Sequence, residues 1–111
     1  MVHIVDVFKK KFSHEKYEKE LEAAKIEKNP EKLAIIACNN IFPKVRLEAI
    51  NHISDESVLA DIAYTDSNKK VRLAAIRKIT DEYVLADISK KDSNRTVRKF
   101  ASTRLKELGH E

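Results

Sequence analysis

Few side chains in this 111-residue chain are of the types that do chemistry, and they are scattered. Four histidines, His3, His14, His52 and His110, share no metal-ligand spacing with one another or with the single cysteine, Cys38. Nucleophilic catalysis needs a nucleophile beside a base, and no motif of that kind is present. We therefore expect no catalytic residues, no cofactor and no metal, and the sequence predicts that the protein is not an enzyme.

Aspartate and arginine form a second pattern, six positions apart, in Asp66 and Arg72 and again in Asp92 and Arg98. Charges that are buried or half-buried in proteins are normally paired. We therefore expect a structural ladder, in which each aspartate accepts hydrogen bonds from backbone amides and neighbouring arginines. Such a ladder would tie one part of the chain to the next.

The ladder residues belong to a repeat of 26 positions, because Val45-Arg46 returns at Val71-Arg72 and at Val97-Arg98. Alignment of residues 54–79 with residues 80–105 gives 13 identities. A period of this size indicates a stack of small units, each too short to bury its own apolar face. Folds of this kind present a surface to partners and seldom carry chemistry.

Composition favours helices and a reducing compartment. The chain has one glycine, two prolines and no tryptophan, which is unlike a sheet with many tight turns. No apolar run approaches the roughly 20 residues that cross a bilayer, and residues 1–12 make a poor signal peptide. A lone cysteine suits the cytoplasm, where we expect the protein to be located. The net charge of +4 permits an acidic partner without requiring one.

Apolar spacing and turn residues predict the helices. Leu59, Ile62 and Ala63 mark one face of a first helix, and Val71 and Ala75 mark a second. With the matching positions in the other units, the pattern predicts helices near 31–39, 43–53, 55–64, 68–79, 82–90 and 94–108. Each unit is thus a short helical hairpin, and we expect the hydroxyl of Ser54 to cap the third of these helices.

The N-terminal segment is expected to cover one end of the stack. Residues 13–28 predict a long helix, in which Leu21 to Ala24 repeat Leu47 to Ile50 after 26 positions. Val2, Val5, Phe8 and Phe12 predict a further amphipathic helix that folds back over it. Frayed structure and homodimerisation through this segment are the alternatives to a capped monomer.

The run from Asp66 to Arg72, followed by Ala75 and Ile79, resembles the HEAT-like repeat of bilin-lyase-type proteins. The resemblance covers about residues 30–108. The first unit departs from it at Asn40, where the family prefers aspartate. It implies an all-α fold, a right-handed α-α superhelix or α-solenoid. Its parts are an N-terminal helical cap at 1–29 and three repeats at about 30–53, 54–79 and 80–108, within one domain.

A binding surface follows from helical geometry, since the second helix of each unit would expose the side opposite its core residues. In HEAT-like stacks this inner helix lines the concave side. The expected partner-binding residues are Lys44, Leu47, Asn51, Lys70, Leu73, Arg77, Lys78, Lys99, Phe100 and Arg104. Exposed apolar residues among charges are typical of a partner site. The alternative is that Leu47 and Leu73 pack between adjacent helices.

The function expected from this surface is protein binding, as an adaptor or scaffold whose partner the sequence does not identify. The alternative is nucleic-acid binding without sequence preference, because the lysines and arginines of the face could meet phosphates. Aromatic residues are sparse, however, and no RNA-binding signature is present. HEAT-like DNA glycosylases grip DNA with such a face, but they use a cleft of aromatic and acidic residues that this chain lacks.

Overall fold

The computed structural model of the chain describes the backbone of residues 4–109 and the side chains of residues 11–109. Every regular element within that range is an α-helix, so the all-α prediction is confirmed. The helices are α1 (Ile4–Ile26), α2 (Pro30–Asn39), α3 (Pro43–Ile50), α4 (Glu56–Thr65), α5 (Lys69–Lys78), α6 (Glu82–Lys91) and α7 (Arg95–Glu107). From α2 onward the predicted bounds agree with the observed ones to within three residues.

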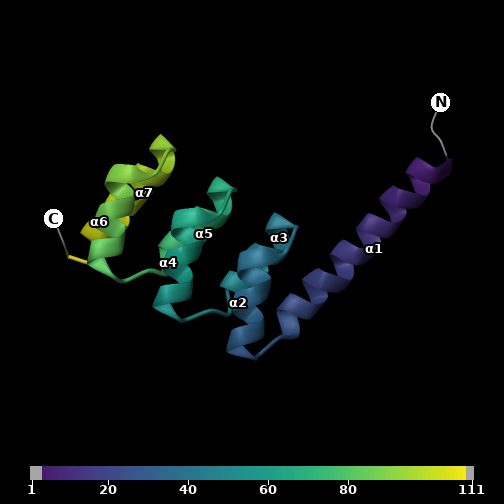
Figure 1. The fold of residues 1–111 in the computed structure, drawn as a ribbon. Helices are drawn as coiled ribbons and strands as arrows, with labels where there is room; N and C mark the ends of the chain where they lie inside the picture. The colour runs from purple at the N-terminus through teal and green to yellow at the C-terminus, as the bar shows by residue number, and fades with distance from the viewer. Residues whose placement is uncertain (1–3, 110–111) are drawn as a thin grey trace.

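The helices lie in two layers (Figure 1). Three hairpins, α2–α3, α4–α5 and α6–α7, are packed side by side in chain order. Helices α2, α4 and α6 form the outer layer, each in contact with the next. Helices α3, α5 and α7 form the inner layer in the same way, and α1 extends this layer by packing against α3. The molecule is elongated, with extents of 57 × 35 × 17 Å.

The core lies between the layers and is built from the same positions in each unit. Leu59 of α4 and Val71 and Ala75 of α5 are almost completely buried. Their counterparts 26 positions before and after are buried as well: Leu33, Val45, Ala49, Leu85, Val97 and Ala101. The alanines allow close approach of the helices, and the larger side chains pack between the layers. Burial of one Leu or Val side chain contributes about 1.5–3 kcal/mol.

Side-chain caps define where most helices begin. Asp55 caps α4 by accepting from the backbone amides of Ser57 and Val58, and Asn68 caps α5. The expectation that the Ser54 hydroxyl caps α4 was therefore wrong by one position. An aspartate carboxylate is as good a cap as a serine hydroxyl, and its hydrogen bond with the Ser57 hydroxyl lowers the pKa of Asp55.

The N-terminal segment differs from the prediction. A separate first helix folding back over residues 13–28 is not observed, because α1 runs without a break from Ile4 to Ile26. No glycine or proline interrupts this stretch, so nothing in it stops the helix. The N-terminal part of α1 points away from the hairpins (Figure 1), and the side chain of Phe12 is 61% exposed. Val2 lies outside the described residues.

Candidate binding surface

The ten residues predicted to bind a partner all lie on α3, α5 and α7 or directly after α3, so the structure places them on the inner layer. Five of them are exposed: Lys44, Asn51, Lys70, Arg77 and Lys99. The other five are half-buried: Leu47, Leu73, Lys78, Phe100 and Arg104. We call the exposed side of α3, α5 and α7 the inner-layer face. Its members do not all have the same role.

The apolar members of the face contribute to the core. Leu47, Leu73 and Phe100 are half-buried and pack against the core cluster between the layers. The guanidinium of Arg77 lies over the Phe100 ring, 5.7 Å from its centre, at a distance suited to a cation–π contact. The alternative that Leu47 and Leu73 pack between helices therefore describes part of their surface, and the remainder is accessible to a partner.

Lys78 and Arg104 have structural hydrogen bonds that the sequence analysis missed. The Lys78 ammonium donates to the carbonyls of Ile50 and Asn51, at 2.8 and 3.2 Å, and to that of Ile53. These carbonyls lie at the C-terminal end of α3 and in the turn after it, where helix carbonyls lack intrahelical partners. Burial lowers the pKa of Lys78. The three carbonyl acceptors favour the charged form of the ammonium.

Arg104 repeats this arrangement one unit later, since it lies 26 positions after Lys78. Its Nε donates to the carbonyl of Ile79, the counterpart of Ile53, at 3.2 Å. Lys78 and Arg104 therefore have a structural role in the fold, besides the partner contact that the sequence predicts for them. The 26-residue repeat could have revealed this role. Lys78 and Arg104 are basic residues at the same position of successive units, and each bonds to carbonyls at the end of the inner-layer helix one unit earlier.

Three lysines of the inner-layer face remain accessible. Lys44, Lys70 and Lys99 are exposed, and none forms an ion pair with another described residue. Lys44 and Lys70 are each the second residue of a helix, and α3, α5 and α7 have no acidic residue in their first turn. Helix N-termini favour negative charge, as in α2, α4 and α6, which have Glu31, Glu56 and Glu82 in their first turns. Lys44 and Lys70 are thus placed where an anionic ligand would be favourable.

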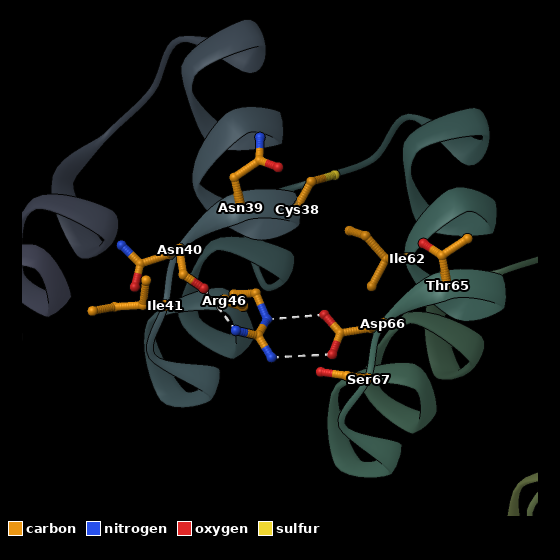
Figure 2. Close-up of a pocket in the computed structure, with 9 residues that line it drawn as sticks. All are labelled: Cys38, Asn39, Asn40, Ile41, Arg46, Ile62, Thr65, Asp66 and Ser67. Atoms are coloured by element: carbon orange, nitrogen blue, oxygen red, sulfur yellow. Dashed lines mark hydrogen bonds and ion pairs between the residues drawn. The ribbon is translucent and has the colours of Figure 1, made fainter.

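A ladder of aspartates and arginines joins one unit to the next, as predicted, but each carboxylate pairs with the arginine twenty positions before it. The arginine six positions after the aspartate donates to its backbone carbonyl instead. Arg46 donates from Nε and Nη2 to the Asp66 carboxylate, at 2.9 and 3.1 Å (Figure 2). Its Nη1 donates to the backbone carbonyl of Asn40, 2.6 Å away. Asp66 also accepts from the amide of Asn68. The Arg46 side chain is 10% exposed and the Asp66 side chain 5% exposed, so both charges are buried and paired, as expected.

The second rung of the ladder has the same form as the first. A further contact, with different residues, lies on the N-terminal side of the first rung. Arg72 pairs with Asp92 at 2.9 and 3.3 Å. In the N-terminal direction, Glu20 of α1 occupies the register position of Arg46, and Asn40 occupies that of Asp66. Here the direction of donation is reversed, because Asn40 Nδ2 donates to Glu20 at 3.1 Å. This correspondence shows that the C-terminal half of α1 takes the place of an inner-layer helix.

A further contact between units lies near the start of α4. Glu56 Oε1 accepts from the amide and the hydroxyl of Thr80, at 2.9 and 2.6 Å. The two hairpins are therefore joined at both ends of their helices, by Glu56 at one end and by Arg72 at the other. The side chains of Arg46, Asp66, Arg72, Asp92 and Glu56 are thus engaged in contacts between units.

Beside each rung of the ladder is a pocket between outer helices. The first, of about 380 Å³, is lined by Cys38, Arg46, Asp66 and neighbouring residues (Figure 2). Partial burial, together with the charges of Asp61 and Asp66, raises the pKa of Cys38 and so favours the less reactive thiol form of its sulfur. The second pocket lies one unit later and has Tyr64 in place of Cys38. Tyr64 donates to Asp87 at 2.8 Å and so links α4 to α6.

Another pocket opens on the inner-layer face itself, and the sequence analysis missed most of its lining. It has a volume of about 510 Å³ and is lined by Tyr17, Phe42, Pro43, Lys44, Leu47, Asn68 and Lys70. The rings of Tyr17 and Phe42 meet edge to face, with centres 5.2 Å apart. Phe42 could have been noticed, because it occupies the position at which the next two units have the capping residues Asn68 and Asn94.

The histidines with described side chains lie at the surface. His14 pairs with Glu18 and His52 with Glu48, each within one turn of helix. His3 and His110 lie outside the described residues. In the part of the chain that the structure describes, no three His, Cys, Asp or Glu side chains gather as metal ligands would. Among the described helices, none combines the length and apolar character of a membrane span.

Comparisons of the chain with models of known protein families, with curated proteins and with solved structures found no match. The candidate binding surface is therefore defined by the chain's own geometry alone.

Proposed function

We propose that the protein is a small HEAT-like repeat protein, an α-solenoid that binds another protein through its inner-layer face. It acts as an interaction module or scaffold in the cytoplasm, without catalysis and without a cofactor. The packing of three similar hairpins in chain order supports the HEAT-like interpretation. So does the ladder, whose ion pairs join successive hairpins at positions that recur with the 26-residue repeat.

One observation carries this proposal: the inner-layer face has accessible charges that the fold does not use. Lys78, Arg104 and Arg72 are engaged in joints between units. By contrast, Lys44, Lys70 and Lys99 make no such contact. Beside them lie the accessible parts of three apolar side chains, Leu47, Leu73 and Phe100. An apolar strip rimmed by free cations is typical of a protein-binding surface.

Nucleic-acid binding is the second candidate function, and the same lysines favour it. Contact with phosphates would weaken steeply as the salt concentration rises, because counterions are released on binding. A contact anchored by apolar side chains would be much less sensitive to salt. Glu48 argues against a phosphate track, because it lies one helical turn after Lys44 on the same helix.

Affinity capture from extracts of the source cell tests the proposal. We expect the wild type to retain one or more proteins from nuclease-treated extract, and the variant Lys44→Glu/Lys70→Glu/Lys99→Glu to lose them. The matched control Lys28→Glu/Lys32→Glu/Lys90→Glu changes the net charge equally on exposed residues outside α3, α5 and α7. Equal capture by both variants would place the binding surface elsewhere. Loss of all capture on nuclease treatment would favour the nucleic-acid function.

A further inference from the structure

The pocket on the inner-layer face is a departure from the repeat, and Phe42 is its cause. In α5 and α7 the residue before the helix is an asparagine whose side chain caps the first turn. In α3 that position holds Phe42, and no side-chain hydrogen bond caps the helix. Replacement of an asparagine cap by an apolar residue costs roughly 0.5–2 kcal/mol. The chain thus has an aromatic ring where its own repeat would place a stabilising amide.

The ring forms an apolar wall together with residues from two other places. Tyr17 of α1 meets Phe42 edge to face, and Leu47 lies on the next turn of α3. All three side chains are half-buried, so part of each remains in contact with solvent. The pocket of about 510 Å³ is large enough for one large apolar side chain, and it has a polar rim, as protein-binding pockets do.

The rim of the pocket is positively charged. Lys44 and Lys70 line it from the first turns of α3 and α5, and neither has an acidic partner among the described residues. Their ammonium groups add to the positive ends of two helices, so the potential around the apolar wall favours carboxylates. Asn68, the remaining polar group of the lining, is occupied in capping α5.

We propose that this pocket binds an acidic peptide segment by enclosing one large apolar side chain between Tyr17, Phe42 and Leu47. Carboxylates on either side of that anchor meet Lys44 and Lys70. The inference rests on the proposed protein-binding function and adds to it the chemistry of the partner: an apolar anchor within an acidic run. Electrostatic attraction steers the segment to the face, and the buried anchor provides the specificity.

A peptide fits this surface better than a nucleic acid does. Glu48 follows Lys44 by one turn, and Glu18 of α1 occupies the register position of Lys44 in the preceding helix. A nucleic-acid backbone carries a charge at every residue and would bring phosphates against these carboxylates. A peptide can place its carboxylates beside the two lysines and neutral residues beside the glutamates. The lysines and glutamates around the pocket therefore fit a peptide in which acidic and neutral residues alternate.

Fluorescence anisotropy with defined probes tests the inference. The probes are a labelled acidic peptide with one central phenylalanine, the same peptide with alanine in its place, a neutral peptide that keeps the phenylalanine, and an oligothymidine. Full burial of a phenylalanine is worth about 1.5–3 kcal/mol, or at least tenfold in affinity. We expect the acidic phenylalanine peptide to bind at least tenfold more tightly than its alanine form, and more tightly than the oligonucleotide.

Two variants and a control locate the contact on the protein. Phe42→Asn removes the aromatic wall while supplying the cap that the repeat uses, so the fold is kept. It should abolish the preference for phenylalanine over alanine. Lys44→Glu/Lys70→Glu should weaken both acidic peptides at least tenfold, whereas the control Lys32→Glu/Lys90→Glu should bind as the wild type does.

Equal binding of the phenylalanine and alanine peptides, or no binding of either, would overturn the inference. Tighter binding of the oligothymidine would overturn it in favour of a nucleic-acid surface. If the peptides fail while the wild type still captures proteins that the triple lysine variant loses, the proposed function stands and only the acidic, apolar-anchored partner is rejected. If capture fails as well, both are rejected.

Discussion

The guanidinium of Arg72 and the carboxylate of Asp92, twenty positions apart in the chain, form a two-bonded ion pair between the second and third hairpins. Their side chains are only 11% and 6% exposed. Arg46 and Asp66 form the same pair one unit earlier. The joints between hairpins thus rest on charges whose desolvation is tolerated only because each has its partner.

Removal of one partner of this pair should destabilise the protein strongly. We expect Arg72→Met to lower the free energy of unfolding by about 3–5 kcal/mol, because it leaves the Asp92 carboxylate buried without its cation. Adding Asp92→Asn should recover part of the loss, since asparagine still accepts from the Asn94 amide, as Asn40 does from Phe42. Urea denaturation measures both. A loss below about 1 kcal/mol in the single variant would show that Asp92 finds another partner.

Adjacent basic residues on α5 should respond differently to substitution. Lys78→Met removes the hydrogen bonds to the carbonyls that follow α3, and we expect a loss of about 1.5–3 kcal/mol. Arg77→Gln removes only the contact with the Phe100 ring and should cost less than about 1 kcal/mol. Thermal unfolding of the two variants side by side makes the comparison. Similar stabilities would contradict the structural role of Lys78.

The phenol of Tyr64 should lose its proton at a higher pH than an ordinary tyrosine does. Burial and the hydrogen bond to Asp87 raise its pKa to about 12. Because this value lies above that of the unfolded chain, the contribution to stability is complete below about pH 10 and is lost as the pH rises towards 12. Ultraviolet absorbance titrations of the wild type and of Tyr64→Phe are compared, and their difference gives the titration curve of the Tyr64 phenol. A midpoint near pH 10 for the missing phenol would contradict the Tyr64–Asp87 bond.

A hydrogen bond like that between Tyr64 and Asp87 can be introduced into the preceding unit by one substitution. Cys38 occupies the register position of Tyr64, and Asp61 occupies that of Asp87. Cys38→Tyr should therefore link α2 to α4 and stabilise the fold by about 0.5–1.5 kcal/mol, the net value of one hydrogen bond. Cys38→Phe is the matched control, because it fills the same space without a hydroxyl. If both variants gain equally, packing and not the hydrogen bond is responsible.

Deletion of residues 1–12 tests how α1 ends the stack. The C-terminal half of α1 packs on α3, so we expect a chain beginning at Ser13 to remain folded and the full chain to be a monomer. Sedimentation velocity of both proteins measures the outcome. A full-length dimer that becomes monomeric on truncation would show that the protruding end of α1 is a dimer contact. Aggregation of the truncated chain alone would show that this end protects the stack.

The sequence predicts local structure in this protein better than it predicts contacts between units. Helix bounds follow from residues within one turn, and the spacing around Val71 and Ala75 placed α5 correctly. The acceptors of Lys78 lie 25 to 28 positions away and depend on how two hairpins are stacked. The apolar pattern of residues 1–28 likewise predicted two helices, where the structure has the single helix α1. The candidate site could be predicted only in part. The sequence predicted the lysines of the inner-layer face, but the pocket also contains Tyr17, which α1 contributes and which the repeat pattern does not reveal.

The ladder gives the stack a direction. Every guanidinium comes from the earlier hairpin and every carboxylate from the later one, so the two ends are not interchangeable. Arg98 already has its Nη1 bonded to the Asp92 carbonyl at 2.7 Å, in the orientation of Arg46 and Arg72. A second copy of residues 80–105 spliced after Leu105 would deliver an aspartate to it in register. At the other end, Glu20 and Asn40 reverse the polarity and terminate the series. The ladder thus leaves an arginine oriented towards a further hairpin after α7, whereas the Glu20–Asn40 rung offers no such arginine before α2.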